Sequence, residues 1–280
     1  QRMNRQSILK SLLAVIVLYR RSPAQSAAYQ SLVDAYRVLG EVPSIFLHDN
    51  SPQPLAVGGP NVYYSHEPNN HGVSLAYNRA SIYAREQRFD WLLLLDQDTR
   101  VTPEFVKALS VCPLAHPESV VFVPRVRDEK GLLSPFQYKS GRGKRITSCP
   151  DKLPLDRFRF INSGLVVSID AFLAASGYDE RIPLDFSDIS FGERLQTSHV
   201  TDHFRVVEAE IFQAFSENEV TSSDVAFERF RFYQKGALAM AEYSTAGLVY
   251  SLRVLMRACK LSVRHRSLRF ISQALRRAND

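Results

Sequence analysis

The sequence predicts an α/β fold in which a Rossmann-like mixed sheet is flanked by helices and followed by a basic helical tail. Apolar runs typical of buried strands alternate with amphipathic segments over residues 12–95, which is the order of a doubly wound sheet with parallel strands. The 280 residues are 45% hydrophobic, which is enough for a sizeable core. We therefore expect one large domain and a tail.

Four strands are predicted in the first hundred residues. Ser22 and Pro23 are typical of a helix start and predict a helix through Leu39, while the turn 69–72 leads into a predicted helix over Val73–Gln87. Four runs of strand length precede, separate and follow these helices, and most of them are rich in apolar residues. They are Leu12–Leu18, Ser44–His48, Asn61–His66 and Trp91–Leu95.

The second half of the chain contains a long polar segment. Residues 127–159 carry glycines, prolines and the basic cluster Lys139–Arg145, and two interpretations stay open: a solvated mobile loop, which we prefer, or a lid over an anionic substrate. Helices are predicted after Thr102, over Ser168–Ser176 and after Leu184. Strands are predicted over Ser119–Pro124, Phe160–Ser168 and Arg205–Phe215.

Composition limits the compartment and the partners. Three dispersed cysteines, Cys112, Cys149 and Cys259, match neither a disulfide framework nor a zinc site, so a reducing cytosol is expected. No apolar run reaches the ~20 residues of a membrane-spanning helix, and no signal peptide is expected because Arg20 and Arg21 follow the first apolar run. The sequence contains no surface of combined aromatic and basic residues of the kind that binds nucleic acids, so no nucleic-acid partner is expected.

The tail, residues 223–280, is predicted to be helical and strongly basic. Between Glu242 and Asp280 it contains no acidic residue, while leucines such as Leu248 and Leu252 recur at helical spacing. Basic amphipathic helices of this kind bind anionic membrane surfaces, which we expect for residues 245–277. The alternative is that the tail packs on the main domain and exposes a charged face.

Two carboxylates follow the most apolar strand. Asp96 and Asp98 end the run that begins at Trp91, where a buried strand emerges from the sheet. Ligands of open α/β sheets bind beyond the carboxyl ends of the strands, and carboxylates are suited to Mg²⁺ or Mn²⁺. An isolated Asp-x-Asp also fits two solvated turn residues, so the motif needs support from other positions.

Further polar groups lie at other predicted strand ends and turns, and together they resemble a known family. The residues concerned are Asp49-Asn50-Ser51, Asn70, Gly72 and Asn78, Asp96-Gln97-Asp98, Asn162-Ser163-Gly164, and Asp185 with Asp188. In this order they resemble the family 2 glycosyltransferases, inverting enzymes of the GT-A fold, and most closely the rhamnosyltransferase-like branch of bacterial polysaccharide biosynthesis. The resemblance covers about residues 1–220.

The resemblance implies a role for each position. Asp188 would be the general base, with Asp185 as the second candidate or as a residue that orients the acceptor. Asp98 and Asp96 would bind the metal ion, and Asn162, Ser163 and Gly164 would line the acceptor pocket. The nucleotide sugar would contact Asp49, Asn50, Asn70, Gly72, Asn78, Asp96 and Gln97.

One position departs from the family pattern. Family members often carry His-x-x-Ser after the last strand, and the histidine completes the metal shell. The matching segment here is Gln213-Ala214-Phe215-Ser216, in which glutamine offers one neutral oxygen. His199 and His203 are nearby in the sequence, so the third ligand is expected to be Gln213, His199, His203 or water.

The function implied by the resemblance is a metal-dependent hexosyltransferase. A domain over 1–222 would hold the nucleotide sugar in its first half, about 1–100, and the acceptor in about 101–222. The favoured donor is dTDP-L-rhamnose, with UDP-galactofuranose, UDP-galactose or UDP-glucose as alternatives. The acceptor would be a cell-surface polysaccharide such as O-antigen or a lipid-linked glycan, and the protein would be cytoplasmic and peripheral on the inner face of the plasma membrane.

Two rival hypotheses come from other classes. Phosphatases of the haloacid dehalogenase type place Asp-x-Asp-x-Thr at a strand end, but here Thr99 follows Asp98 directly and Arg100 occupies the threonine position. The other rival is an inactive GT-A-like scaffold on the membrane surface. In that case the basic tail would carry the function by binding the membrane. The missing histidine favours the scaffold, whereas the three acids Asp96, Asp98 and Asp188 favour an enzyme.

Overall fold

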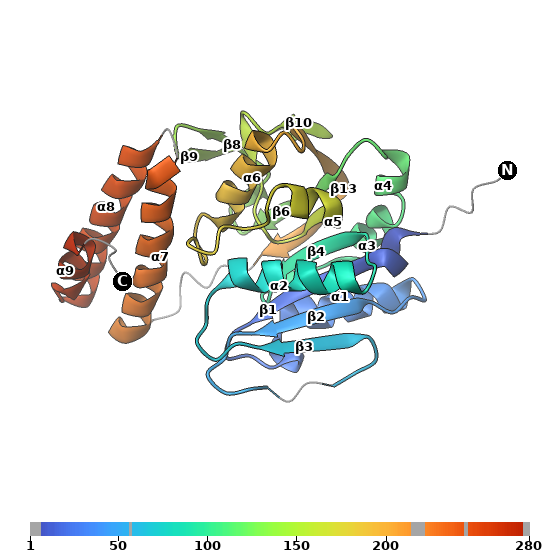
Figure 1. Cartoon of the computed structure of the whole chain (residues 1–280), viewed down its shortest axis with the longest axis horizontal. Helices are drawn as coiled ribbons and strands as arrows, with labels where there is room; N and C mark the ends of the chain where they lie inside the picture. Colours follow the sequence, from blue (N-terminus) through green and yellow to red (C-terminus); the bar gives the residue numbers. More distant parts are fainter. Residues whose placement is uncertain (1–6, 56–57, 214–221, 244–245, 277–280) are drawn as a thin grey trace.

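The computed structural model describes residues 7–55, 58–213, 222–243 and 246–276. A mixed sheet forms the centre of the described chain, and helices cover both of its faces (Figure 1). β5 (Thr99–Arg100) pairs with β13, and β7 (Gly131–Ser134) pairs with β6. The main order of strands is β10 (Lys152–Pro154), β13 (His203–Gln213), β6 (Val121–Asp128), β12 (Leu165–Ser168), β4 (Trp91–Asp96), β1 (Leu12–Leu18), β2 (Ser44–Asp49) and β3 (Val62–His66).

Six strands of the main order point in the same direction, so their carboxyl ends lie at one edge of the sheet. β1, β2, β3 and β4 are parallel to one another, as the sequence predicts, and β6 and β13 run in the same direction. β12 is antiparallel to both of its neighbours, β4 and β6. Its predicted start at Phe160 is wrong, because Gly164 adopts φ +83° and the strand begins only at Leu165. Strand β6 also extends further than predicted, to Asp128.

Two apolar cores lie on opposite faces of the sheet. One contains residues of α2 (Val73–Glu86), α5 (Ile169–Ala174) and α6 (Ser187–Thr197), and the other contains residues of α1 (Ala27–Val38) and α3 (Pro103–Leu109). The strand residues alternate between these cores, as the two-residue period of a strand requires. Short helical turns complete this part: η1 (Ile8–Ser11), η2 (Pro23–Gln25) and α4 (Cys112–Ala115).

The start of α1 differs from the prediction. Ser22 and Pro23 begin the separate turn η2, and α1 starts only at Ala27, where the side chain of Ser26 accepts a hydrogen bond from the amide of Tyr29. Ser26 therefore provides a hydrogen-bond acceptor for one of the unpaired amides at the helix start, as N-cap serines usually do.

The polar segment 127–159 is ordered into strands, so the preferred interpretation as a mobile loop is wrong. β8 (Phe136–Lys139), β9 (Arg142–Arg145) and β11 (Phe158–Arg159) form a second sheet in the order β11-β8-β9. Leu153 is buried in the core of the main domain, and the buried Tyr138 hydrogen-bonds Tyr250 of the tail. Strands of two to four residues are too short for a visible alternation of apolar and polar residues.

The tail forms three helices that pack together and against the main domain. They are α7 (Ser223–Tyr243), α8 (Gly247–His265) and α9 (Arg269–Leu275), at the left of Figure 1. Their shared core includes Phe230, Met240 and Tyr250, and it also contains Ile182 from the segment before α6. Within the described residues, no helix has the length and apolar content that crossing a membrane requires.

Candidate active site

Asp96 and Asp98 lie at the carboxyl end of β4, where the sequence places them. The hydroxyl of Ser163 donates to Asp96 Oδ2 over 2.5 Å, and the hydroxyl of Tyr77 lies 3.5 Å from Asp96 Oδ1. Burial raises the pKa of Asp96 to about 6, although the Ser163 hydrogen bond opposes this, and the carboxylate of Asp98 adds to the rise. The two acids therefore share one partly desolvated site.

Gln213 faces Asp98 with its amide nitrogen. Gln213 Nε2 donates to Asp98 Oδ1 over 2.6 Å, while Gln213 Oε1 accepts from the hydroxyl of Thr99 over 2.8 Å. An ionised carboxylate can only accept hydrogen bonds, so it orients the amide in this way. In this arrangement Gln213 orients Asp98 and does not present an oxygen to an ion. Residues 214–216 of the matching motif lie outside the described residues.

The prediction that His199 or His203 completes the metal shell is wrong. His203 begins β13 and Gln213 ends it, so ten residues of strand separate them, roughly 33 Å. The ring of His203 is 2.6 Å from Asp202, and His199 is exposed after α6, at that same distant end. No group of three or more His, Cys, Asp or Glu side chains suited to a metal occurs in the described part of the chain.

Two carboxylates nevertheless fit a divalent ion of this kind. Mg²⁺ in enzymes is commonly held by one or two carboxylates, with substrate phosphates and water completing the shell. Asp98 Oδ1 accepts from Gln213, and both oxygens of Asp96 have hydroxyl partners within 3.5 Å. These partners orient the acids in the way that supporting hydrogen bonds orient metal ligands.

The segment 162–164 joins the β4 acids to the start of α6. Asn162 Nδ2 donates to the hydroxyl of Ser187 over 3.0 Å, and Asn162 Oδ1 accepts from the hydroxyl of Tyr178 over 2.8 Å. The next residue, Ser163, holds Asp96. Gly164 has no room for a side chain, because a Cβ atom there would lie 2.5 Å from Pro124. The predicted acceptor-side residues thus form a hydrogen-bonded bridge between the two parts of the site.

Asp188 lies in the first turn of α6 and is the strongest base candidate. Its Oδ1 accepts from the amide of Ile189 over 2.8 Å. Burial, together with the nearby carboxylates of Asp96 and Asp185, raises the pKa of Asp188 to about 7. A carboxylate with a pKa near neutrality combines the ionised form with useful proton affinity, which is what general-base catalysis requires.

Asp185 is directed toward the tail instead. Its Oδ1 is 3.9 Å from Arg257 of α8, and a Cβ atom on Gly236 of α7 would lie only 2.7 Å from its carbonyl oxygen. Its other carboxylate oxygen is buried without a hydrogen-bond partner in the described structure. The two acids are thus distinguished by their surroundings: Asp188 faces Asp96, and Asp185 faces the tail.

Phe186 connects these two acids through an unusual backbone. It adopts φ +73°, a left-handed conformation that is strained for a bulky residue. Its ring packs 5.1 Å from Tyr233 of α7 and 5.3 Å from Tyr250 of α8, measured between ring centroids. The hydroxyl of Tyr250 in turn hydrogen-bonds that of Tyr138 in β8. Aromatic packing from the tail therefore holds the turn that leads to Asp188.

The glycine turn before α2 packs against the same segment. Gly72 adopts φ +87°, and a Cβ atom there would lie 2.1 Å from the carbonyl oxygen of Pro183. That oxygen accepts from the amide of Val73 over 2.7 Å, and Asn50 donates to the Gly72 carbonyl over 3.2 Å. Glycine is required here for a close contact with Pro183, and the expected contact of Gly72 with the nucleotide sugar stays a prediction. Asn70 precedes it in a turn with φ +48°.

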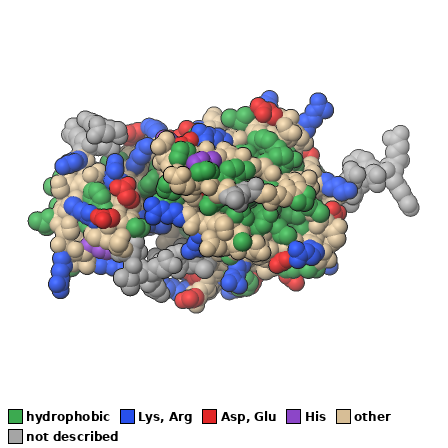
Figure 2. All heavy atoms as spheres, turned by 90° about the horizontal axis from the view of Figure 1, so that it is seen from below, with side chains coloured by type: hydrophobic (Ala, Val, Ile, Leu, Met, Phe, Trp, Pro, Cys, Tyr) green, Lys and Arg blue, Asp and Glu red, His purple; other side chains and the backbone are tan. Residues whose placement is uncertain are grey.

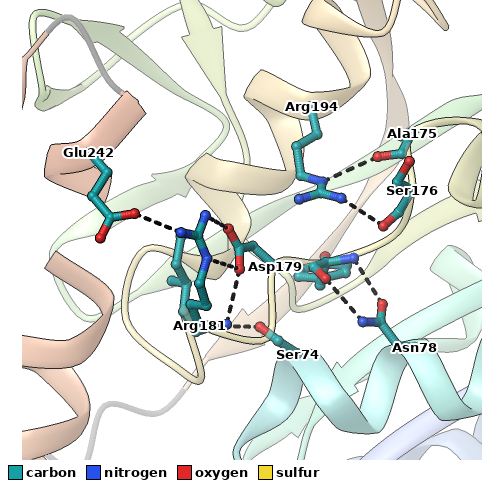
Figure 3. Close-up of polar contacts among 10 residues, drawn as sticks. Ser74, Asn78, Ala175, Ser176, Asp179, Arg181, Arg194 and Glu242 are labelled. Atoms are coloured by element: carbon teal, nitrogen blue, oxygen red, sulfur yellow. Dashed lines mark hydrogen bonds and ion pairs between the residues drawn. The ribbon is translucent and has the colours of Figure 1, made fainter. Parts of the chain in front are cut away.

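Asn78 also has a structural role, and its contact with the donor stays a prediction. Its amide donates to the carbonyl of Tyr178 and to Glu180, and it accepts from the amide of Tyr178 over 2.9 Å. Figure 3 shows this contact beside a second one, in which Arg181 lies between Asp179 and Glu242 of α7. The loop before Asp185 is therefore held from α2 on one side and from the tail on the other.

Asp49 and Gln97 complete the predicted set. Asp49 accepts from the amides of Ser51 and Leu55 and from the hydroxyl of Tyr64 over 2.6 Å, so its carboxylate shapes the turn after β2. Gln97 Oε1 accepts from the amide of Tyr19 over 2.9 Å and thereby joins the ends of β4 and β1. Both groups stabilise the edge of the sheet where the acids lie.

Sequence reasoning missed two groups of site residues. Tyr77 and Tyr178 pack 5.1 Å apart beside Asp96 and Asn162, and nothing in their sequence context marks them. Burial raises the pKa of Asp98, while Arg21 and Arg229 lie near enough to oppose this rise. Arg21 follows β1 at the same sheet edge, which could have identified it. Arg229 is on α7, in the tail for which the sequence predicted membrane binding or packing on the main domain but no role in the site.

The fold is that of the GT-A glycosyltransferases. A crystal structure of GalNAc-T7 with UDP, GalNAc and Mn²⁺ aligns with a TM-score of 0.59 and 11% identity, over 98% of this chain and 57% of that chain. A crystal structure of S. aureus TarS 1-349 in complex with UDP-GlcNAc aligns with a TM-score of 0.50 and 12% identity, over 86% and 69% of the two chains. Neither protein-family models nor curated protein sequences match the chain.

Proposed function

We propose that this chain is a glycosyltransferase that moves a sugar from a nucleoside diphosphate sugar to a hydroxyl group of a glycan, with inversion at the anomeric carbon. One observation carries the proposal: within a GT-A fold, the carboxylates of Asp96, Asp98 and Asp188 meet at one edge of the sheet. The similar structures of GalNAc-T7 and TarS contain UDP or UDP-GlcNAc, which supports a nucleotide-sugar donor.

Each acid has a separate task in this reaction. Asp188 accepts the proton of the acceptor hydroxyl as that oxygen attacks the anomeric carbon, and the diphosphate leaves from the opposite face. Asp98 and Asp96 would hold Mg²⁺ or Mn²⁺, which neutralises charge on the leaving diphosphate when bound. Arg21 and Arg229 add positive charge near Asp98, on the side where the leaving group carries its negative charge.

The favoured donor is dTDP-L-rhamnose, and the alternatives are UDP-galactofuranose, UDP-galactose and UDP-glucose. The preference rests on the resemblance of the motifs to the rhamnosyltransferase-like branch. The acceptor is a cell-surface polysaccharide or a lipid-linked glycan, which places the protein in the cytoplasm at the inner face of the plasma membrane.

The donor and the ion are tested together by thermal shift with dTDP, UDP and other nucleoside diphosphates in Mn²⁺. We expect one nucleotide to raise the melting temperature by mass action, and the same nucleotide sugar to be turned over only with a divalent ion. If no nucleotide shifts the transition at millimolar concentration, the glycosyltransferase proposal is wrong. Full turnover in excess chelator would exclude only the role given to the ion.

A membrane surface is the partner proposed for the outer face of α8. Four apolar side chains at helical spacing are strongly exposed there: Leu248 (89%), Leu252 (56%), Met256 (55%) and Val263 (80%). Exposed basic residues, including Lys260 and Arg264, accompany them. In Figure 2, blue basic side chains and green apolar ones both appear on the tail, at the left of the view. Positive charge beside exposed apolar side chains suits anionic lipid.

Point substitutions test membrane binding better than a truncation at Ser222, because a truncation would also remove the helices that pack on Phe186. Leu248→Asp with Leu252→Asp should lower co-sedimentation with anionic liposomes at least ~10-fold, since burying each leucine contributes roughly 1.5–3 kcal/mol. Val38→Asp, an exposed apolar position on α1, is the matched control. Equal sedimentation of all three proteins would contradict membrane binding.

A further inference from the structure

A cavity of about 540 Å³ lies beside the carboxyl end of β6 and is strongly basic. Its lining includes Arg125 and Arg127 of β6, Lys130 of the turn after it, and Arg145 of β9. The other lining residues are apolar or uncharged, such as Leu132 and Ile146, and no carboxylate lines the cavity among the described residues. Four cations, three from β6 and the turn after it and one from β9, thus face one space of ligand size.

Acidic residues outside the lining hold some of these cations in place. Arg145 is paired with Asp128, whose side chain is only 8% exposed, and Arg127 Nε donates to Glu210 over 2.6 Å. A guanidinium carries five N–H donors, so a single bond through Nε leaves most of them available to a ligand. Side chains fixed in this way lose less conformational entropy when they bind an anion.

Two of the four cations make no hydrogen bond to a carboxylate of the described chain through their side chains. The nearest carboxylate to Arg125 is that of Asp151, at 3.9 Å, which is beyond hydrogen-bond distance. The exposed ammonium group of Lys130 makes no side-chain hydrogen bond among the described residues, and it interacts with the carboxylate of Asp128 through charge alone. The cavity therefore retains unused donors and positive charge.

The cavity lies on the same edge of the sheet as the site acids. β6 is parallel to β13, and Arg127 is opposite Phe212 in the register of the two strands. The next residue of β13, Gln213, contacts Asp98. The cavity is therefore beside the catalytic edge, within the half of the domain where the acceptor is expected. The basic cluster Lys139–Arg145 of the sequence contributes Arg145 to it.

We propose that this cavity binds a phosphate group carried by the acceptor, at a distance from the hydroxyl that reacts. This proposal rests on the function proposed above and specifies the acceptor as an anionic glycan. Arginine forks match the oxygens of phosphate, and several cations around one space suit a group with one or two negative charges. The phosphate can be the diphosphate that joins a glycan to its lipid, or a phosphodiester within a polymer.

Binding is measured by calorimetry in metal-free buffer with two probes, inorganic pyrophosphate for the lipid-linked group and bis(glycero)phosphate for a phosphodiester. The test variant is Lys130→Glu, at an exposed turn, and the control is Lys144→Glu, an exposed position on β9 that does not line the cavity. An Asp98→Asn variant reports on binding at the donor site. UDP is titrated into every protein as a separate measurement.

We expect at least one probe to bind the wild type and the Lys144→Glu and Asp98→Asn variants equally, and the Lys130→Glu variant at least ~10-fold more weakly. The tighter probe identifies the source of the phosphate. The proposal is overturned if neither probe binds, if Lys130→Glu and Lys144→Glu weaken binding equally, or if only Asp98→Asn weakens it. UDP binding that persists in those cases leaves the proposed glycosyltransferase function intact.

Discussion

The two ends of the candidate site are built in different ways. At the donor end, Asp96 and Asp98 follow a strand buried in the sheet and need only the direction of β4 to reach the edge. At the base end, Asp188 follows Phe186, whose left-handed backbone is held by Tyr233 and Tyr250 from the tail. The donor end thus depends on contacts within the main domain, whereas the base end also depends on packing against the helices of the tail.

The largest effect is expected from Asp188→Asn, which removes the base and leaves the donor end unchanged. Turnover should fall by roughly 10²–10⁴-fold, while the affinity for the donor nucleotide stays nearly the same. Asp185→Asn is the matched control, since Asp185 faces Arg257 and the tail. Initial rates with a saturating donor, and calorimetry with the nucleotide, separate the two effects. A larger loss in Asp185→Asn would transfer the role of base to Asp185.

Gly236→Ala tests whether the tail positions the base. The added methyl group would lie 2.7 Å from the carbonyl oxygen of Asp185, so α7 must move away from the segment before α6. We expect turnover to fall about 10- to 100-fold, because misplacement of a catalytic group by ~1 Å has effects of that size. Donor affinity should fall less than turnover, because Gly236 contacts Asp185 and Phe186, whereas Arg229, the α7 residue near Asp98, lies about two helical turns away.

The control for this substitution is Lys235→Ala, at the exposed neighbouring position of α7. Alanine is intrinsically better than glycine within a helix by about 0.8–1 kcal/mol, so helix propensity itself does not destabilise the variant. Thermal melting and turnover are measured on both proteins. Wild-type turnover in Gly236→Ala would show that the tail does not position Asp188.

This contrast also explains which parts of the molecule the sequence could predict. Continuous apolar runs identify β1, β2 and β4, and the rule that parallel strands share one edge brings Asp96 and Asp98 to the site. The packing contacts of Gly72 and Asn78 could not be predicted, because their partners, Pro183 and Tyr178, are about 100 residues away in the chain. Contacts of that separation leave no periodic signal in a single sequence.

The loss of activity at low pH should distinguish the base, Asp188, from the donor-end carboxylate, Asp96. Asp188 must be ionised to accept a proton, so kcat/KM should fall about tenfold for each pH unit below its pKa of about 7. Protonation of Asp96, with a pKa of about 6, should steepen the fall at lower pH. A flat profile between pH 5 and 8 would contradict the assignment of Asp188. The measurement is kcat/KM for the donor at constant ionic strength.

Stability should change with pH in the opposite direction. The pKa values of Asp96 and Asp188 are raised above the ordinary 3.8, so the folded chain binds these protons more tightly than the unfolded chain. Their contribution to stability is complete below pH about 4 and is lost as the pH rises through about 6 and about 7. Asp188→Asn should remove its share of this dependence and melt higher than the wild type at pH 8.

The smallest expected effect concerns Gln213, where the donor end departs from the family pattern. Its amide nitrogen donates to Asp98 over 2.6 Å, and its side chain is buried between Asp98 and Thr99. Gln213→His would replace this donor by an imidazole, which is a better ligand for Mn²⁺ than an amide. One added ligand should tighten Mn²⁺ binding in the presence of nucleotide by about tenfold, or ~1.4 kcal/mol.

Gln213→Met is the control, because it is similar in size and supplies neither a hydrogen bond to Asp98 nor a hard ligand. Mn²⁺ binding is measured by titration followed by electron paramagnetic resonance. We expect the affinity for Mn²⁺ to be highest in Gln213→His, intermediate in the wild type and lowest in Gln213→Met. If histidine and methionine weaken binding equally, the essential property of Gln213 is its hydrogen bond to Asp98. The donor end would then depend on a partner in β13, and so on tertiary contacts, just as the base end depends on the tail.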